Sequence, residues 1–270
     1  MTHRNLGLLL AVVLIAGAAA AFWYMRAVPE PVPVEAPAGL DAPSEPEVEP
    51  GPEFPIEPPT LVREEVPELT PLPPLEQSDA YFEIELVELF GTGIADLLVD
   101  EALIEKVVAT VDALPTTQVA EKVRPIGPLL GSFTVDGQDD SGIYALNPAS
   151  HERYDFLVTL AASADIDIVT QSYRRFYPLL QEAYVNLGYP NGHFNDRVVE
   201  VIDHLLETPA VDEPVQLVRP HVLYEFADPS LESLSAGQKM LLRAGNDHSV
   251  RIKQFLEEFR DAITSAGTRR

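Results

Sequence analysis

The chain has 270 residues, a formal net charge of −25 at pH 7 and no cysteine. A chain this acidic repels phosphate backbones and anionic lipid surfaces, which excludes nucleic-acid binding as its main role. The lack of cysteine excludes disulfide bonds, thiolate catalysis and cysteine-ligated metals.

The first feature along the chain is an uncharged, mostly apolar run over residues 6–25, which is long enough to cross a bilayer as one helix. The run ends in aromatic residues followed by Arg26, a pattern typical of a helix end at a membrane interface. We therefore predict a retained signal anchor, a transmembrane helix at residues 6–25, after a cytoplasmic tail at residues 1–5. A cleaved signal peptide is the alternative, because the alanines at 18–21 offer a cleavage site.

The short basic tail also indicates the orientation of this helix. It favours a cytoplasmic N-terminus, with the remainder of the chain exported. In a bacterium this gives a single-pass protein of the inner membrane, with its C-terminal domain in the periplasm.

The next stretch, residues 26–75, holds fifteen of the chain's 25 prolines together with many glutamates. Proline removes amide donors and favours polyproline II, and the glutamates repel one another. This composition predicts a disordered Pro/Glu-rich linker that holds the domain away from the membrane. A proline-rich ligand for a partner domain is the alternative.

Residues 76–270 predict a single, mainly α extracytoplasmic domain with short β segments. Helices are expected at 79–90, 100–114, 150–162, 165–187, 195–206, 236–244 and 247–265. Short extended runs are expected at 133–135, 143–146, 215–218 and 222–226.

Particular residues predict where these helices begin, end or bend. Ser78 is expected to cap the first helix, and Ser235 and Gln238 have the spacing of a capping box. Gly245 is expected to end the helix that follows this box. Pro178 predicts a kink in, or a division of, the helix at 165–187.

Two helices carry apolar stripes that predict burial against the core. The C-terminal stripe recurs at helical spacing and consists of Ile252, Phe255, Leu256, Phe259 and Ile263. The stripe of the helix at 165–187 consists of Phe176, Leu180, Ala183 and Leu187.

Several segments resemble a known family. They include residues 72–79, 108–115, 173–209 and 224–245, and the most specific part comprises residues 184–190 and 194–197. Over about residues 72–263 the chain resembles a proteobacterial envelope family catalogued as a domain of unknown function, numbered 3014. The resemblance implies a bacterial membrane-anchored protein with a tethered domain, and it implies no activity and no catalytic residues.

The residues around the loop at 188–193 form a candidate interaction surface, because tyrosine and arginine dominate interface hot spots. The candidate residues are Tyr173, Arg174, Tyr177, Tyr184, Tyr189, His193, Asn195, Asp196 and Arg197. The structural alternative is that the tyrosines belong to the core. In that interpretation Asn195 caps a helix, and Arg197 pairs with Glu200 or Asp196.

Motifs for catalysis or metal binding are weak. The sequence contains no HExxH, GxSxG, P-loop or GxGxxG, so we predict no catalytic residues, no metal site and no cofactor. Two metal alternatives are a site formed by His193, Asp196 and His221, and a calcium loop at 136–141 that lacks the regular spacing of acids.

Together these features predict a non-catalytic adaptor or scaffold of the bacterial cell envelope whose partner is an envelope protein. One alternative is a cell-wall-associated module that binds or hydrolyses glycans such as peptidoglycan. A second alternative is a homo-oligomeric structural element joined through the anchor and the C-terminal helix.

Overall fold

A computed structural model describes residues 51–56, 71–137 and 142–265. The transmembrane helix predicted at residues 6–25 lies outside these ranges, and so does most of the predicted linker. Among the described residues, none of the helices combines the length and the apolar character needed to span a bilayer.

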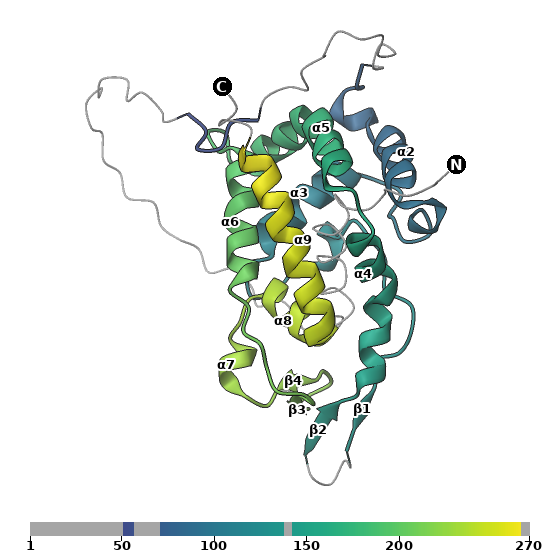
Figure 1. Cartoon of the computed structure of the whole chain (residues 1–270), viewed down its shortest axis with the longest axis vertical. Helices are drawn as coiled ribbons and strands as arrows, with labels where there is room; N and C mark the ends of the chain where they lie inside the picture. Colours follow the sequence, from purple (N-terminus) through teal and green to yellow (C-terminus); the bar gives the residue numbers. More distant parts are fainter. Residues whose placement is uncertain (1–50, 57–70, 138–141, 266–270) are drawn as a thin grey trace, which may run out of the picture.

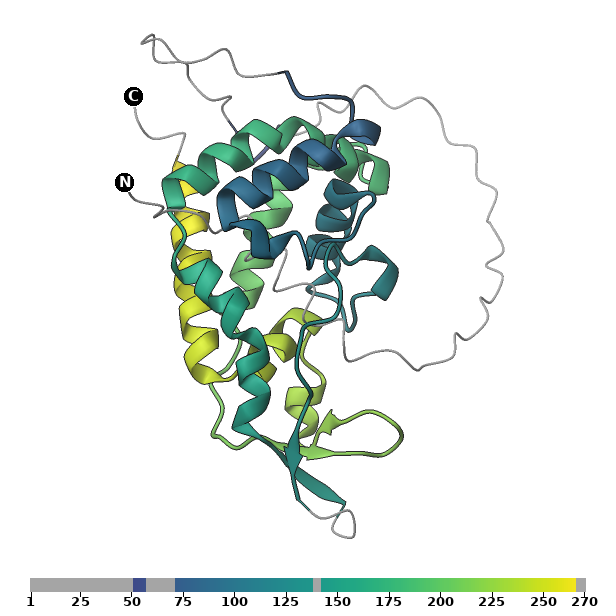
Figure 2. The same cartoon turned by 90° about the vertical axis from the view of Figure 1, so that its right-hand side faces the viewer.

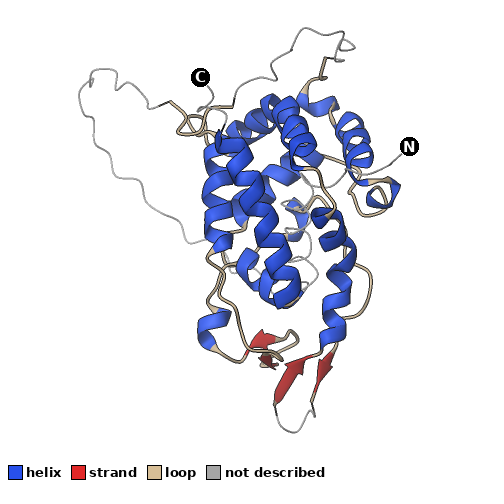
Figure 3. Ribbon diagram, in the orientation of Figure 1, coloured by secondary structure: helices blue, strands red, loops and turns tan. Residues whose placement is uncertain are grey.

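The described part is mainly helical, as the sequence predicts (Figure 1). Short 3-10 turns lie at Leu75–Gln77, Thr92–Ile94, Glu121–Val123 and Pro148–Tyr154. The α-helices are α2 (Asp79–Phe90), α3 (Leu103–Ala113), α4 (Asp155–Ala162), α5 (Ile166–Leu187), α6 (Phe194–Leu206), α7 (Pro229–Glu232), α8 (Ala236–Ala244) and α9 (Asn246–Thr264). The strands gather at one end of the helical body (Figure 3).

Helix α3 lies in the core of the domain, in contact with α2, α5 and α6. Its buried residues are Leu103, Ile104, Val107, Val108, Thr110 and Val111, which cover more than one face. On one side, α2 runs beside α5 (Figure 2), where the rings of Phe82 and Phe176 lie 5.1 Å apart. The same two helices are joined by an ion pair of 2.8 Å between Glu85 and Arg175.

The C-terminal helix α9 closes the core against α4, α5, α6 and α8. All five residues of its predicted stripe are buried, which confirms that prediction. The predicted stripe of α5 is confirmed except at its end. There Leu187, the last residue of α5, is 41% exposed.

Pro178 does not divide α5, which is one helix of 22 residues. Pro178 is exposed, so the carbonyl that lacks its helical donor lies on the solvent side. Of the two outcomes predicted at Pro178, a kink or a division, the division into two helices is therefore wrong.

Ser78 also differs from the prediction, because its side chain caps no helix. Its hydroxyl donates instead to the carbonyl oxygen of Leu75 at 2.7 Å, within the preceding 3-10 turn. By contrast, the capping box of Ser235 and Gln238 is present at the start of α8, and Gly245 ends that helix at φ 90°.

Four short antiparallel strands form a sheet in the order β1 (Val135–Asp136), β2 (Ile143–Leu146), β3 (Gln216–Val218) and β4 (Glu225–Phe226). In register, Leu217 of β3 faces Tyr144 of β2 and Phe226 of β4. These three side chains and Leu242 of α8 belong to a second, smaller core. Helix α8 therefore joins the sheet to the helical body.

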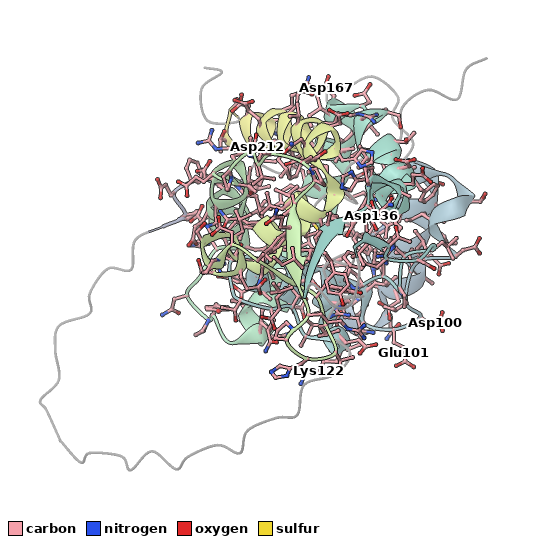
Figure 4. All side chains as sticks on the ribbon, turned by 90° about the horizontal axis from the view of Figure 1, so that it is seen from below. Asp100, Glu101, Lys122, Asp136, Asp167 and Asp212 are labelled. Atoms are coloured by element: carbon pink, nitrogen blue, oxygen red, sulfur yellow. The ribbon has the colours of Figure 1, made fainter. Side chains whose placement is uncertain are left out.

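Acidic side chains lie on several sides of the domain. The labelled residues Asp100, Glu101, Asp136, Asp167 and Asp212 are all exposed, and they lie on strand β1, on helix α5 and in two loops (Figure 4). Solvent and dissolved salt screen exposed charges that lie this far apart, which weakens the repulsion among them.

The start of α3 is capped by a carboxylate from another helix. Asp79, the first residue of α2, accepts the main-chain N–H of Ala102 and of Leu103, each at 2.8 Å. Ala102 has φ 54°, a left-handed conformation that costs a non-glycine residue about 1 kcal/mol. The two hydrogen bonds offset this cost and fix the entry into the central helix.

We expect Asp79→Ala to lower the free energy of unfolding by about 2 kcal/mol, because two amides at a helix start lose their acceptor. Urea denaturation of the purified chain measures the change. Glu83→Ala removes an exposed acid from the same helix and is the matched control, expected to change stability by under about 0.5 kcal/mol. Equal stabilities of the two variants would contradict the capping role of Asp79.

Candidate functional site

Gln181 of α5 holds the end of the loop between α5 and α6 with both atoms of its side-chain amide. Its amide nitrogen donates to the carbonyl of Gly192 at 2.8 Å, and its amide oxygen accepts the main-chain N–H of Phe194 at 2.8 Å. A Cβ at Gly192 would approach Cε1 of Tyr184 to 2.9 Å, so a glycine is needed for this close turn. The loop therefore presents the first turn of α6 in a fixed position.

A segment from far upstream binds to this first turn. Asp196 accepts the main-chain N–H of Glu53 at 3.0 Å with one carboxylate oxygen and that of Phe54 at 2.8 Å with the other. The amide nitrogen of Asn195 donates to the carbonyl oxygen of Phe54 at 2.9 Å. Phe54 and Ile56 are partly buried against the helical core. Residues 51–56 thus lie on the domain, although the sequence assigns them to a disordered linker.

Asn195 is oriented by a buried tyrosine. The hydroxyl of Tyr173 donates to the amide oxygen of Asn195 at 2.9 Å, which leaves the amide nitrogen directed at Phe54. Burial raises the pKa of Tyr173 well above its usual value, and the nearby groups of Tyr177 and Asp196 add to the rise. Tyr173 therefore stays protonated and remains a donor. We call Tyr173, Asn195 and Asp196 the peptide site.

A second group of polar residues lies beside the peptide site and is centred on Asp112, at the end of α3. The guanidinium of Arg197 donates to the Asp112 carboxylate and to the Asp112 carbonyl, each at 2.8 Å. The Tyr189 hydroxyl donates to the same carboxylate at 3.1 Å, and Glu200 pairs with Arg197 at 2.8 Å. The ring of Tyr189 stacks on that of Tyr184, with centroids 4.6 Å apart. We call Asp112, Tyr189, Arg197 and Glu200 the Asp112 cluster.

The charges of this cluster shift the pKa values of its members. The hydrogen bond to Asp112 and the charge of that carboxylate raise the pKa of Tyr189. Burial, then the Asp112 charge, raises the pKa of Tyr184 to about 12. Burial lowers the pKa of Arg197, but Glu200 and Asp112 outweigh burial, and the net pKa is raised.

The structure thus divides the candidate surface into parts. Tyr173, Tyr177, Asn195 and Asp196 lie around segment 51–56, and Tyr184, Tyr189 and Arg197 lie in or against the Asp112 cluster. Arg174 lies apart from both, since its guanidinium donates to the carbonyl of Ala262 on α9. His193 is the N-cap residue of α6 without a side-chain capping bond.

The structural alternative is correct in part. Tyr173 and Tyr184 are buried, and Arg197 pairs with Glu200. However, Asn195 is the second residue of α6 and caps nothing. Asp196 does not pair with Arg197, because its two oxygens accept main-chain donors.

Sequence reasoning missed Asp112, Gln181 and Phe54. The position of Asp112 could have been recognised from the sequence. An acid in the last turn of a helix is unfavourable to the helix dipole, which predicts that a cation pairs with it. Gln181 and Phe54 carry no comparable signal, since each acts on residues that are near only after folding.

Among the described residues, no group of three or more His, Asp or Glu side chains is placed to hold a metal ion. His193, Asp196 and His221 therefore belong to no such group. The acidic loop at 136–141 lies partly outside the described residues.

The fold and the site define a mainly helical domain whose polar side chains bind a segment of its own chain. Residues 103–260 match the family described as Protein of unknown function (DUF3014). Since this match covers more than half of the chain, the chain belongs to that family, as its sequence resemblance predicts. No curated protein and no solved structure matches the chain. The peptide site and the Asp112 cluster lie within the matched range, whereas segment 51–56 lies before it.

We expect Asp112→Asn to lower the pKa of Tyr189, because the hydrogen bond to the ionised Asp112 carboxylate and the charge of that carboxylate both raise it. The absorbance titration of the wild type minus that of Tyr189→Phe isolates this phenol, and the same difference is measured in the Asp112→Asn background. Because the folded pKa is raised, the phenol adds to stability below its unfolded pKa of about 10 and loses that contribution as the pH rises through the folded value.

The matched control for this titration is Asp167→Asn, which neutralises an exposed acid on α5. It should leave the Tyr189 titration unchanged. An unshifted Tyr189 titration in Asp112→Asn would show that the carboxylate does not govern this phenol.

Proposed function

We propose that this chain is a non-catalytic adaptor of the bacterial cell envelope, which binds a segment of a partner protein at the peptide site. The observation that carries the proposal is that the first turn of α6 already binds a polypeptide segment, residues 51–56, through its main-chain groups. A surface that hydrogen-bonds peptide N–H and C=O groups has the chemistry of a protein-binding site.

The chemistry of the site supports binding rather than catalysis. Both oxygens of Asp196 accept amide donors, and both amide atoms of Asn195 are engaged. Arg197 is paired with Asp112 and Glu200. The hydrogen bonds of these groups fix the local structure. They also orient a peptide ligand that binds across the first turn of α6.

The N-terminal sequence supports a proposal for where in the cell this adaptor lies. We propose that residues 6–25 anchor it in the inner membrane and that the linker holds the domain in the periplasm. The apolar run and the proline- and glutamate-rich stretch behind it are the support for this localisation.

Covalent crosslinking in intact cells, followed by capture and mass spectrometry, tests the adaptor proposal. The wild-type chain should capture a defined envelope protein, and Asp196→Ala should reduce that capture at least about tenfold, since it removes the acceptor of two hydrogen bonds. Asp167→Ala is the matched control and should capture the same protein as the wild type.

Circular dichroism first establishes that each variant folds. Capture that Asp196→Ala leaves unchanged would contradict a partner site on α6. Capture of wall fragments alone would contradict the adaptor and favour the glycan-binding alternative.

A further inference from the structure

Segment 51–56 is bound by features that a separate peptide could share. Its contacts are two successive N–H groups, one carbonyl and two partly buried apolar side chains, and the Pro52, Glu53 and Pro55 side chains are exposed. We propose that the peptide site accepts a segment of the same chemistry from a partner protein, in competition with residues 51–56. This inference rests on the proposed function and names its ligand class.

The hydrogen bonds define what such a ligand must contain. Asp196 needs donors at two successive positions, so a proline can occupy neither the position of Glu53 nor that of Phe54. The chain bends at these two residues, and a bend can direct successive N–H groups at a single anion. An apolar residue is then required at the position of Phe54, followed by a second one at the position of Ile56.

Proline on either side of this pair makes the segment a better ligand. Pro52 and Pro55 fix their own φ angles, and they therefore reduce the freedom that the unbound segment loses on binding. Both prolines are exposed, so the site needs no pocket to accommodate their side chains. The preferred ligand is a short proline-flanked bend with an aromatic residue directly before the second proline.

The site and its present ligand are separable parts of the chain. Asn195 and Asp196 project from α6, and Tyr173 supports them from α5, within the range matched by the family. Residues 51–56 precede that range and contribute neither helix nor strand. Displacing them would leave the hydrogen-bonding groups of the site in place, because Gln181 and Tyr173 hold the first turn of α6.

Connection to the domain gives the internal segment an advantage over a free peptide. Ligands tethered to their own site reach effective concentrations on the order of millimolar. If the segment has an intrinsic Kd of about 0.1 mM, a competing free peptide binds about tenfold more weakly to the wild type than to a chain whose own segment is disabled. A partner segment must therefore bind tightly enough, or be concentrated enough, to displace the internal segment.

Direct peptide binding tests the proposal. The probe is a fluorescently labelled peptide that copies residues 50–57, titrated with the full chain purified in detergent. We expect the apparent Kd to be about tenfold lower for Phe54→Ala/Ile56→Ala than for the wild type, since the double variant frees the site. A peptide with alanine in place of phenylalanine should bind neither chain.

Two further variants assign the binding to the site. Adding Asp196→Asn to the double variant should remove peptide binding, whereas adding Asp167→Asn should leave it unchanged. Equal affinity of the wild type and the double variant would overturn the competition. Binding that persists with Asp196→Asn, or no binding of the peptide at about 1 mM of the double variant, would overturn the site.

The peptide-binding experiment needs no envelope partner. It therefore tests the ligand class separately from the proposed adaptor function. Failed peptide binding with intact crosslinking capture would overturn the ligand class and leave the adaptor standing. Dimers of the wild type that form with increasing concentration and vanish in the double variant would assign the site to a second copy of the chain and overturn the partner ligand.

Discussion

Asn195, Asp196 and Arg197 follow one another in the first turn of α6, and together they contact three other parts of the chain. Asn195 joins α5 to segment 51–56, Asp196 binds the main chain of that segment, and Arg197 holds the end of α3. An acid in a first helical turn is favoured by the helix dipole, so Asp196 is well placed to accept external donors. Three successive side chains therefore fix the relative positions of two core helices and an upstream segment.

This arrangement makes the site and the core interdependent. The first turn of α6, which carries the groups that bind segment 51–56, is itself held by Tyr173 and Gln181 of α5 and by Asp112 of α3. Buried hydrogen bonds of this kind are strong when every member has its partner and costly when one is missing. The protein can thus present peptide-binding groups in a fixed geometry, and the same bonds that orient the groups also stabilise the fold.

The sequence predicts those features that depend on near neighbours. The predictions of the capping box at Ser235 and of the stripe of α9 are correct, because a capping box spans four successive residues and a stripe lies on one helix. The cap predicted at Ser78 fails for a local reason, since its hydroxyl donates to Leu75, but other predictions fail where a distant residue decides. The start of α3 depends on Asp79, and the amide of Asn195 is engaged by Tyr173 and Phe54, so neither appears in a local pattern. The tyrosines of the candidate surface are found, but their division into two groups depends on Asp112 and on segment 51–56.

The central claim is that Asp196 binds the amides of Glu53 and Phe54 in the folded chain. Native-state hydrogen exchange of the full chain in detergent, read at the Phe54 amide, tests this claim most directly. The account predicts that this amide exchanges more slowly than it does in an unstructured peptide of the same sequence, and that Asp196→Ala abolishes the protection while the amides of α9 stay protected. Exchange of the Phe54 amide at the unstructured rate in the wild type would contradict the account.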